Sequence, residues 1–147
     1  MKFKLIIDKE CQEEIVARVR TPNQLTAAIE NLVLSYTGAD TITVYTEDDI
    51  LQLSFSQIEL ITVMDRKTLV VDIQGHTYRL YQRLWEVEQQ LPSYFIRINK
   101  STIANENHIM RYNTVITGAV DAIFRSGNKE YVSRRCFAEI RRRFERS

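Results

Sequence analysis

Three short clusters of basic, amide and hydroxyl side chains stand out among the residues that could bind a ligand. The clusters are Arg66 and Lys67, then Asn99, Lys100 and Ser101, and last Arg134 and Arg135. Arg and Lys donate hydrogen bonds to the major-groove acceptors of guanine, Asn pairs with adenine, and Ser hydroxyls suit phosphate oxygens. These residue types therefore indicate a nucleic-acid interface, provided that the fold brings the three clusters to one edge.

Other chemistry is poorly represented in the sequence. His76 and His108 have no paired cysteine or carboxylate at ligand spacing, and the acidic run 47–49 lacks the spacing of a calcium loop. Cys11 and Cys136 are the only cysteines and have no metal-binding spacing. The four glycines form no phosphate-cradling loop. We expect that the protein is not an enzyme and that it binds no metal, cofactor or small-molecule substrate. Among the functions considered, a small hydrolase is the least favoured.

Charge is divided unevenly along the 147 residues, although the formal net charge is only +1. Residues 1–92 hold 9 Lys and Arg against 14 Asp and Glu, a net of −5, whereas residues 93–147 hold 11 against 5, a net of +6. A basic half is typical of a protein that binds a polyanion, but a solvated charged surface would have the same composition.

The chain begins with two alternating segments, 2–8 and 14–20, that predict β-strands. A helix is predicted next, with Thr21 as its cap, Pro22 in the first helical position and Gln24 completing a capping box. This pattern predicts a β-β-α unit over residues 1–39.

From residue 40 onwards the pattern is mostly that of strands. "KTLVVDI" and "HTYRLY" predict a hairpin around Gln74-Gly75, and "QRLWEVEQQL" predicts a short helix that Pro92 ends. Strands are predicted at 109–113 and 115–124, then "EYVS" as a last strand and "RRCFAEIRRRFERS" as a basic helix. We take residues 40–147 as one domain.

The segment "FIRINKSTIANENHI" resembles the signature of LytTR DNA-binding domains, and "GNKEYVSRRCFAEIRRRF" is similar to the last strand and basic terminal segment of that family. The resemblance covers about residues 40–147. It implies a mostly β (α+β) fold of small antiparallel sheets with a short helix. In this fold loops, rather than a recognition helix, enter successive major grooves of DNA.

By position, the three clusters match the three DNA-contact loops that the resemblance implies. Lys67, Lys100 and Arg135 are then expected to read bases. Arg66, Asn99, Ser101 and Arg134 would hold phosphates or support the loops. Some relatives have His at the position of Lys67 and Asn or Arg at that of Lys100, so the target sequence is expected to differ. Ile98 stands where some relatives carry a redox-sensitive cysteine, which argues against thiol sensing there.

The resemblance also implies how the protein works as a whole. Residues 1–39 are too short for a receiver domain, so we expect a standalone bacterial transcription regulator that binds double-stranded DNA as a homodimer, at least on DNA. Regulators of this kind resemble proteins controlled by a small membrane protein. The absence of an apolar run of bilayer length predicts a cytoplasmic location. The alternative is a protein-interaction module that has kept the fold without DNA binding.

Overall fold

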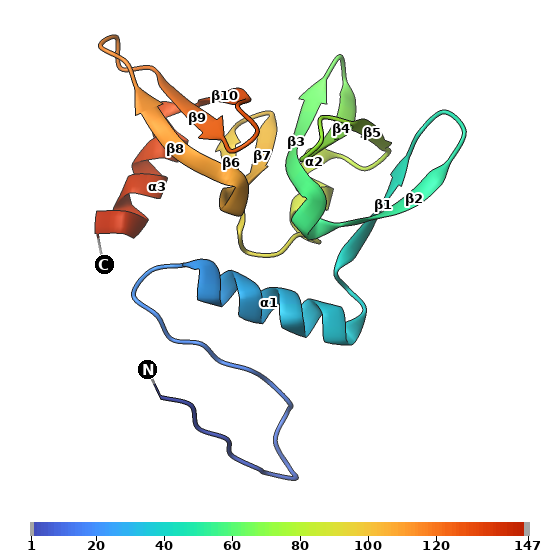
Figure 1. Ribbon diagram of the computed structural model, residues 1–147, viewed down its shortest axis with the longest axis vertical. Helices are drawn as coiled ribbons and strands as arrows, with labels where there is room; N and C mark the ends of the chain where they lie inside the picture. The colour runs from blue at the N-terminus through green and yellow to red at the C-terminus, as the bar shows by residue number, and fades with distance from the viewer. Residues whose placement is uncertain (1, 146–147) are drawn as a thin grey trace.

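Ten strands and three α-helices form the folded part of the computed structural model, which describes residues 2–145 (Figure 1). The elements run in this order: α1 Gln24–Thr37, β1 Thr41–Tyr45, β2 Ile50–Ser54, η1 Phe55–Gln57, β3 Ile58–Met64, β4 Lys67–Asp72, β5 Thr77–Leu80, α2 Leu84–Glu88, β6 Phe95–Asn99, β7 Thr102–Asn105, η2 Glu106–His108, β8 Ile109–Thr114, β9 Val120–Phe124, β10 Lys129–Val132 and α3 Arg134–Glu145. The mostly β, antiparallel architecture confirms the predicted fold class.

The strands form two separate antiparallel sheets. The larger has the order β2-β1-β5-β4-β3-β7-β6, and the smaller has the order β10-β9-β8. Strands β3, β7 and β6 send side chains into two cores: Ile61 and Ile103 join the cluster near α2, whereas Leu60 and Ile98 join the cluster beneath β8–β10 and α3. Burial on both faces explains why β3, with the sequence IELITVM, carries apolar residues on both of its faces instead of alternating strictly.

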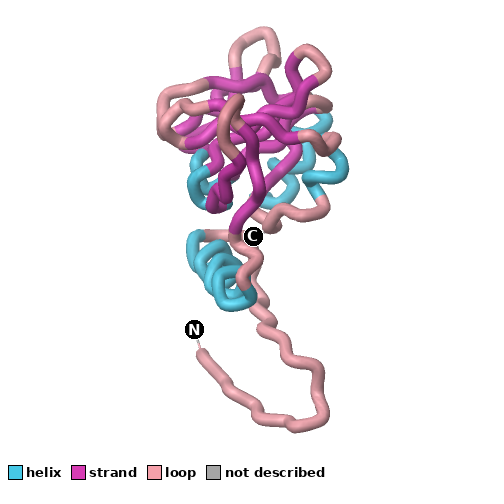
Figure 2. The backbone as a smooth tube through the Cα atoms, turned by 90° about the vertical axis from the view of Figure 1, so that its right-hand side faces the viewer, coloured by secondary structure: helices cyan, strands magenta, loops and turns pink. Residues whose placement is uncertain are grey.

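The strands predicted at 2–8 and 14–20 are not formed, and this part of the prediction was wrong. Residues 2–20 are all exposed and run as an extended segment beyond α1, with a turn near Asp8 (Figure 2). Alternation creates an amphipathic segment, but a strand also needs a partner that accepts and donates its ladder hydrogen bonds. The described chain offers this segment no such partner.

Helix α1 is present, but it begins two positions later than the predicted cap implies. Asn23 is the N-cap: its side chain accepts from the Thr26 amide at 3.1 Å, and the Thr26 hydroxyl accepts from the Asn23 amide at 2.9 Å. Asn caps as well as Thr, so a capping box two residues further on replaces the predicted one at Thr21. Pro22 therefore precedes the cap.

Helix α1 packs against the β-rich part of the chain. Ala27 is buried in the larger core, Glu30 accepts hydrogen bonds from the Ser93 amide and hydroxyl, and Asn31 accepts one from the Tyr94 hydroxyl. Burial and the nearby charge of Glu30 raise the pKa of Tyr94 to about 12, so its hydroxyl stays protonated as a donor. The unattached part of the N-terminal extension is thus residues 2–20.

Two further predictions differ in extent from the structure. The helix predicted from "QRLWEVEQQL" is only Leu84–Glu88, and β9 starts at Val120 because residues 115–119 form a turn that Gly118 closes at a φ of 86°. Among the described residues no helix is long and apolar enough to cross a membrane.

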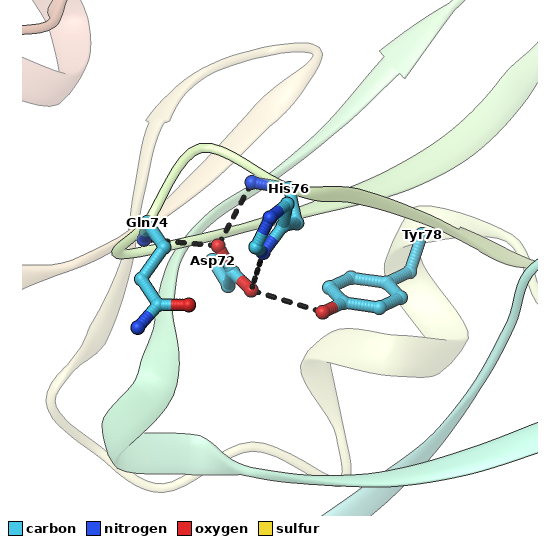
Figure 3. A network of polar contacts seen from close by, with 4 residues as sticks. All are labelled: Asp72, Gln74, His76 and Tyr78. Carbon is cyan, nitrogen blue, oxygen red and sulfur yellow. Dashed lines mark hydrogen bonds and ion pairs between the residues drawn. The ribbon is translucent and has the colours of Figure 1, made fainter.

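The β4–β5 turn is organised by one buried carboxylate (Figure 3). Asp72 accepts hydrogen bonds from the amides of Gln74 and His76, each at 2.9 Å, and from the Tyr78 hydroxyl at 3.0 Å, and it lies 3.3 Å from Nδ1 of His76. Burial alone would raise the pKa of Asp72, but these hydrogen bonds and the His76 ring outweigh it and hold the pKa below its usual value. The carboxylate therefore pins the end of β4 that lies opposite the Arg66–Lys67 turn.

Candidate nucleic-acid interface

The first cluster forms a tight turn between β3 and β4. Met64 pairs with Lys67, which leaves only Asp65 and Arg66 in the loop, with φ values of 52° and 65°. Two consecutive residues with positive φ define the turn type that suits the twist of a hairpin, and glycine or asparagine is usual there. Arg66 thus holds a conformation that arginine disfavours, with its side chain exposed beside that of Lys67.

The second cluster is a braced turn between β6 and β7. Asn99 donates from Nδ2 to the Tyr131 carbonyl at 2.7 Å and accepts from the Ser101 amide at 2.9 Å. Arg97 donates to the Lys100 carbonyl at 2.8 Å and pairs with Glu88 at 2.8 Å. These bonds use the Asn99 side chain inside the protein and leave that of Lys100 exposed. The sequence pattern did not indicate that Arg97 supports this turn.

The third cluster opens helix α3. The Ser133 hydroxyl accepts from the Cys136 amide at 3.2 Å and the Ser133 carbonyl from the Phe137 amide at 2.9 Å, so Ser133 precedes the helix as its cap. Arg134 and Arg135 are the first two helical residues, and both are exposed. Cations at this end oppose the helix dipole. Their placement therefore favours a role in binding over one in helix stability.

Backbone hydrogen bonds bring the three clusters to one edge. Val63, just before the first turn, donates to the Ser101 carbonyl at 2.9 Å, and Ser133, just before α3, donates to the Ile98 carbonyl at 2.9 Å. The Asn99–Tyr131 bond adds a second link between the second and third clusters. We call the seven residues Arg66, Lys67, Asn99, Lys100, Ser101, Arg134 and Arg135 the loop edge. The β3–β4 turn projects on the side of the molecule opposite α1 (Figure 1).

A fourth loop, which the sequence pattern did not indicate, adjoins the loop edge. The β8–β9 turn, 115–119, projects on the same side as the β3–β4 turn (Figure 1), and a methyl group on Gly118 would lie 3.7 Å from Nη2 of Arg134. Ile116 at this turn is fully exposed. The apolar pattern predicted a strand through these residues, although the Thr117-Gly118 pair was a usable turn signal.

The loop edge carries unneutralised positive charge. Three arginines outside the loop edge have a carboxylate partner: Arg97 pairs with Glu88, Arg141 with Glu145 and Arg143 with Glu106. The cations of the loop edge make no ion pair with any described residue: Arg66, Lys67, Lys100, Arg134 and Arg135. The described residues also contain no cluster of three or more His, Cys, Asp or Glu side chains that could hold a metal. An exposed basic edge of this kind suits an anionic partner.

Comparison with known proteins gives consistent matches. Residues 48–145 match the LytTr DNA-binding domain family. A solved LytTr DNA-binding domain, from a methyl-accepting/DNA response regulator of Bacillus cereus, is 26% identical with a TM-score of 0.66, and the match covers 71% of this chain and 96% of that one.

Relatives of similar length also match. An HTH-type transcriptional regulator of Staphylococcus aureus strain MSSA476 is 28% identical over 144 residues, and one from strain NCTC 8325 is 27% identical over 144 residues; each alignment covers 97% of both chains. These alignments therefore include most of residues 2–20, which lie outside the family match. Despite the "HTH-type" in those names, α1 and α2 here are separated by five strands and do not form a helix-turn-helix. The family match, the shared fold and the basic loop edge lead to one assignment: the chain belongs to the LytTR DNA-binding domain family.

Proposed function

We propose that the protein is a sequence-specific transcription regulator that reads double-stranded DNA through the loop edge, with loops entering successive major grooves. The observation that carries this proposal is the convergence of the three clusters through the Val63–Ser101, Ser133–Ile98 and Asn99–Tyr131 hydrogen bonds. Because these bonds fix the turns before DNA arrives, little loop entropy is lost on binding.

Within the loop edge we assign two kinds of role. Lys67, Lys100 and Arg135 read bases, since their side chains are exposed and long enough to reach the groove floor. Arg66 and Arg134 contact phosphates, and the amide groups at the start of α3 add partial positive charge beside Arg134.

The remaining two members of the loop edge support the turns. Asn99 is a brace rather than a base reader, because both ends of its amide group are used inside the protein. Ser101 supports the β6–β7 turn through its carbonyl, which accepts from Val63 and from the Thr62 hydroxyl.

We further propose that two copies bind adjacent half-sites as a homodimer, with the N-terminal extension as the dimerisation unit. Two modest single-domain affinities would then combine into tight binding that depends on half-site spacing.

Paired arginine variants test the DNA-reading role. Arg135→Ala should cost about 1–3 kcal/mol of binding free energy and relax preference at one base position. Arg134→Ala should weaken binding to all sequences evenly, and Arg142→Ala, an exposed arginine in the last turn of α3, is the matched control. Footprinting on the protein's own promoter supplies the fragment. A folded Arg135→Ala protein with full affinity and specificity would contradict the assignment.

The alternative is a protein-interaction module without DNA binding. The observation that favours it is the exposed apolar N-terminal segment 2–20, which suits a protein partner better than DNA. A promoter without protection at low salt would support this alternative over the regulator.

A further inference from the structure

The segment 2–20 exposes more apolar surface than a free terminus normally does. Phe3 is 90% exposed and Ile7 84%, and helix α1, which lies between this segment and the sheets (Figures 1 and 2), also exposes Leu32 and Tyr36. Terminal segments that stay unpaired are usually polar, because apolar groups in water are unfavourable. Several large apolar side chains exposed within one segment indicate an interaction site.

Each half of this segment has the pattern of a strand. We call residues 2–8 the first arm and residues 14–20 the second arm; between them the Asp8 carboxylate accepts from the Glu10 amide at 3.0 Å in a turn. Odd-numbered positions carry the apolar face of both arms: Phe3, Leu5 and Ile7 in the first, Ile15, Ala17 and Val19 in the second. Both arms are therefore ready to pair once a suitable edge is supplied.

Charge opposes pairing of the two arms with each other. A hairpin that joins them through residues 9–13 and keeps both apolar faces together places like charges opposite at three positions. These pairs are Lys2 with Arg20, Lys4 with Arg18, and Asp8 with Glu14. Like charges directly opposite destabilise an antiparallel pair. This repulsion explains why the arms lie apart in the structure.

Charge favours pairing of each arm with the same arm of a second copy. In an antiparallel pair centred on Leu5, Lys2 lies opposite Asp8 of the second copy, Phe3 lies opposite Ile7, and Leu5 lies opposite itself. In the second arm, a pair centred on Ala17 places Glu14 opposite Arg20 of the second copy. Both arrangements keep the odd-numbered apolar residues on one face, with Ile6 and Val16 on the other, and replace repulsion by attraction.

We propose that the arms pair between two copies of this chain, each antiparallel to its own counterpart, with two-fold centres at Leu5 and Ala17. This inference deepens the proposed homodimer and rests on it, but it does not depend on DNA binding. A C2 dimer requires such self-complementary contacts, in which the same residues meet from both subunits. The apolar side of the paired arms and the exposed face of α1 then supply the surface to be buried.

Disulfide trapping on the full chain tests the register. In a Cys11→Ser, Cys136→Ala background, Leu5→Cys and Ala17→Cys should each form a covalent dimer on mild oxidation, because directly opposite residues have Cβ atoms about 5 Å apart. Lys9→Cys is the matched control. It would lie about 27 Å from its counterpart if the first arm continued straight, and it should not cross-link.

Charge reversal tests the pairing independently. Lys2→Asp and Asp8→Lys should each raise the dimer Kd about tenfold, and the double variant should restore it. If the arms instead formed a hairpin within one chain, Lys2→Asp would gain attraction to Arg20 and leave association unchanged. Sedimentation equilibrium on the unmodified and variant chains measures the Kd.

The possible results separate this proposal from the DNA-binding one. The arm pairing would be overturned if the full chain were monomeric at tens of micromolar, both free and on DNA with two half-sites. The segment 2–20 would then be assigned to binding a different protein. A dimer without cross-links at Leu5→Cys and Ala17→Cys would also overturn it. The affinity of the Lys2→Asp variant for a single DNA half-site should equal that of the unmodified chain. If neither the unmodified chain nor the variants bound DNA, the DNA-binding proposal would be contradicted and the arm-pairing proposal would be unaffected.

Discussion

The loop edge and the N-terminal segment 2–20 are both exposed, but they are built in opposite ways. The loop edge displays cations on turns that hydrogen bonds hold in place, as Asn99 ties the β6–β7 turn to Tyr131. The segment 2–20 displays apolar side chains on a backbone without ladder partners in the described structure. The first is suited to a rigid charged partner such as DNA, and the second to a partner that completes its backbone pairing.

The contrast teaches that exposure alone does not reveal a function. An exposed cation such as Lys100 is hydrated at little cost, so its placement on a braced turn is the informative feature. An exposed Phe3 is unfavourable as it stands, so the residue type is informative by itself. Each region therefore needs its own kind of perturbation.

The two regions should differ most in how their binding depends on salt concentration. If the loop edge neutralises about six phosphates, raising salt from about 50 to 200 mM should lower DNA affinity about a thousandfold, with a log–log slope of roughly −5. Association through the segment 2–20 should change by less than about tenfold, because apolar burial drives it. Titration of a promoter fragment and sedimentation of the free protein at the same salt concentrations provide both numbers. A flat DNA response would contradict phosphate contacts at the loop edge.

Substitution of Asp72 should change the stability of the protein without directly altering the loop edge or the segment 2–20. Asp72→Asn removes the charge that holds the β4–β5 turn, so it should lower the free energy of unfolding by about 1–2 kcal/mol at pH 7. The folded-state pKa of Asp72 is lowered, so its contribution is complete at neutral pH and is lost as the pH falls below about 4. Urea unfolding at pH 7 and pH 3 should show the gap between the two proteins narrowing. DNA affinity at pH 7 should stay unchanged, and a large loss would show that the turn and the loop edge are coupled.

Sequence alternation predicted most of the strands correctly, and its failure at the N-terminus has a clear cause. Ile42 and Val44 alternate in β1 much as Ile15, Ala17 and Val19 do in the second arm. The difference is that β1 has β2 as a partner, which begins only five residues after β1 ends, with register pairs such as Val44–Leu51. Periodicity describes what a segment can do, and only the availability of a partner decides whether a strand forms.

The residues of the candidate site were singled out by type and their binding role stays a prediction, whereas their arrangement could not be predicted. Residue types singled out the loop edge, because Arg, Lys, Asn and Ser recur at the predicted element ends. Sequence spacing could not show that Ser101 bonds Val63, since that contact depends on the pairing of β7 with β3. For the same reason the bracing role of Arg97 and the proximity of Gly118 to Arg134 were not predictable.

Removing the Asn99 side chain should show how far DNA binding by the loop edge depends on the hydrogen bonds that hold the β6–β7 turn. Asn99→Ala removes the bonds to Tyr131 and Ser101, so it should lower stability by about 1 kcal/mol and DNA affinity about tenfold. Asn107→Ala, an exposed asparagine in η2, is the matched control. If Asn99 acts by positioning, combining its variant with Arg135→Ala should give losses that differ from the sum by at least about 0.5 kcal/mol. Strict additivity in that double-mutant cycle would favour a direct contact.

Replacing Arg66 should give the smallest change in stability, but stability and DNA affinity should change in opposite directions. Its φ of 65° is one that glycine adopts without cost, so Arg66→Gly should raise the free energy of unfolding by up to about 1 kcal/mol. The same variant removes a cation from the loop edge, so DNA affinity should fall about tenfold. Arg66→Lys keeps both the charge and the disfavoured backbone, and it should resemble the unmodified protein in stability and in most of its affinity. Stability and binding that move in opposite directions are expected where backbone strain is retained for function. Urea unfolding together with promoter binding measures both quantities, and an Arg66→Gly protein that binds as tightly as the unmodified chain would remove the β3–β4 turn from the interface.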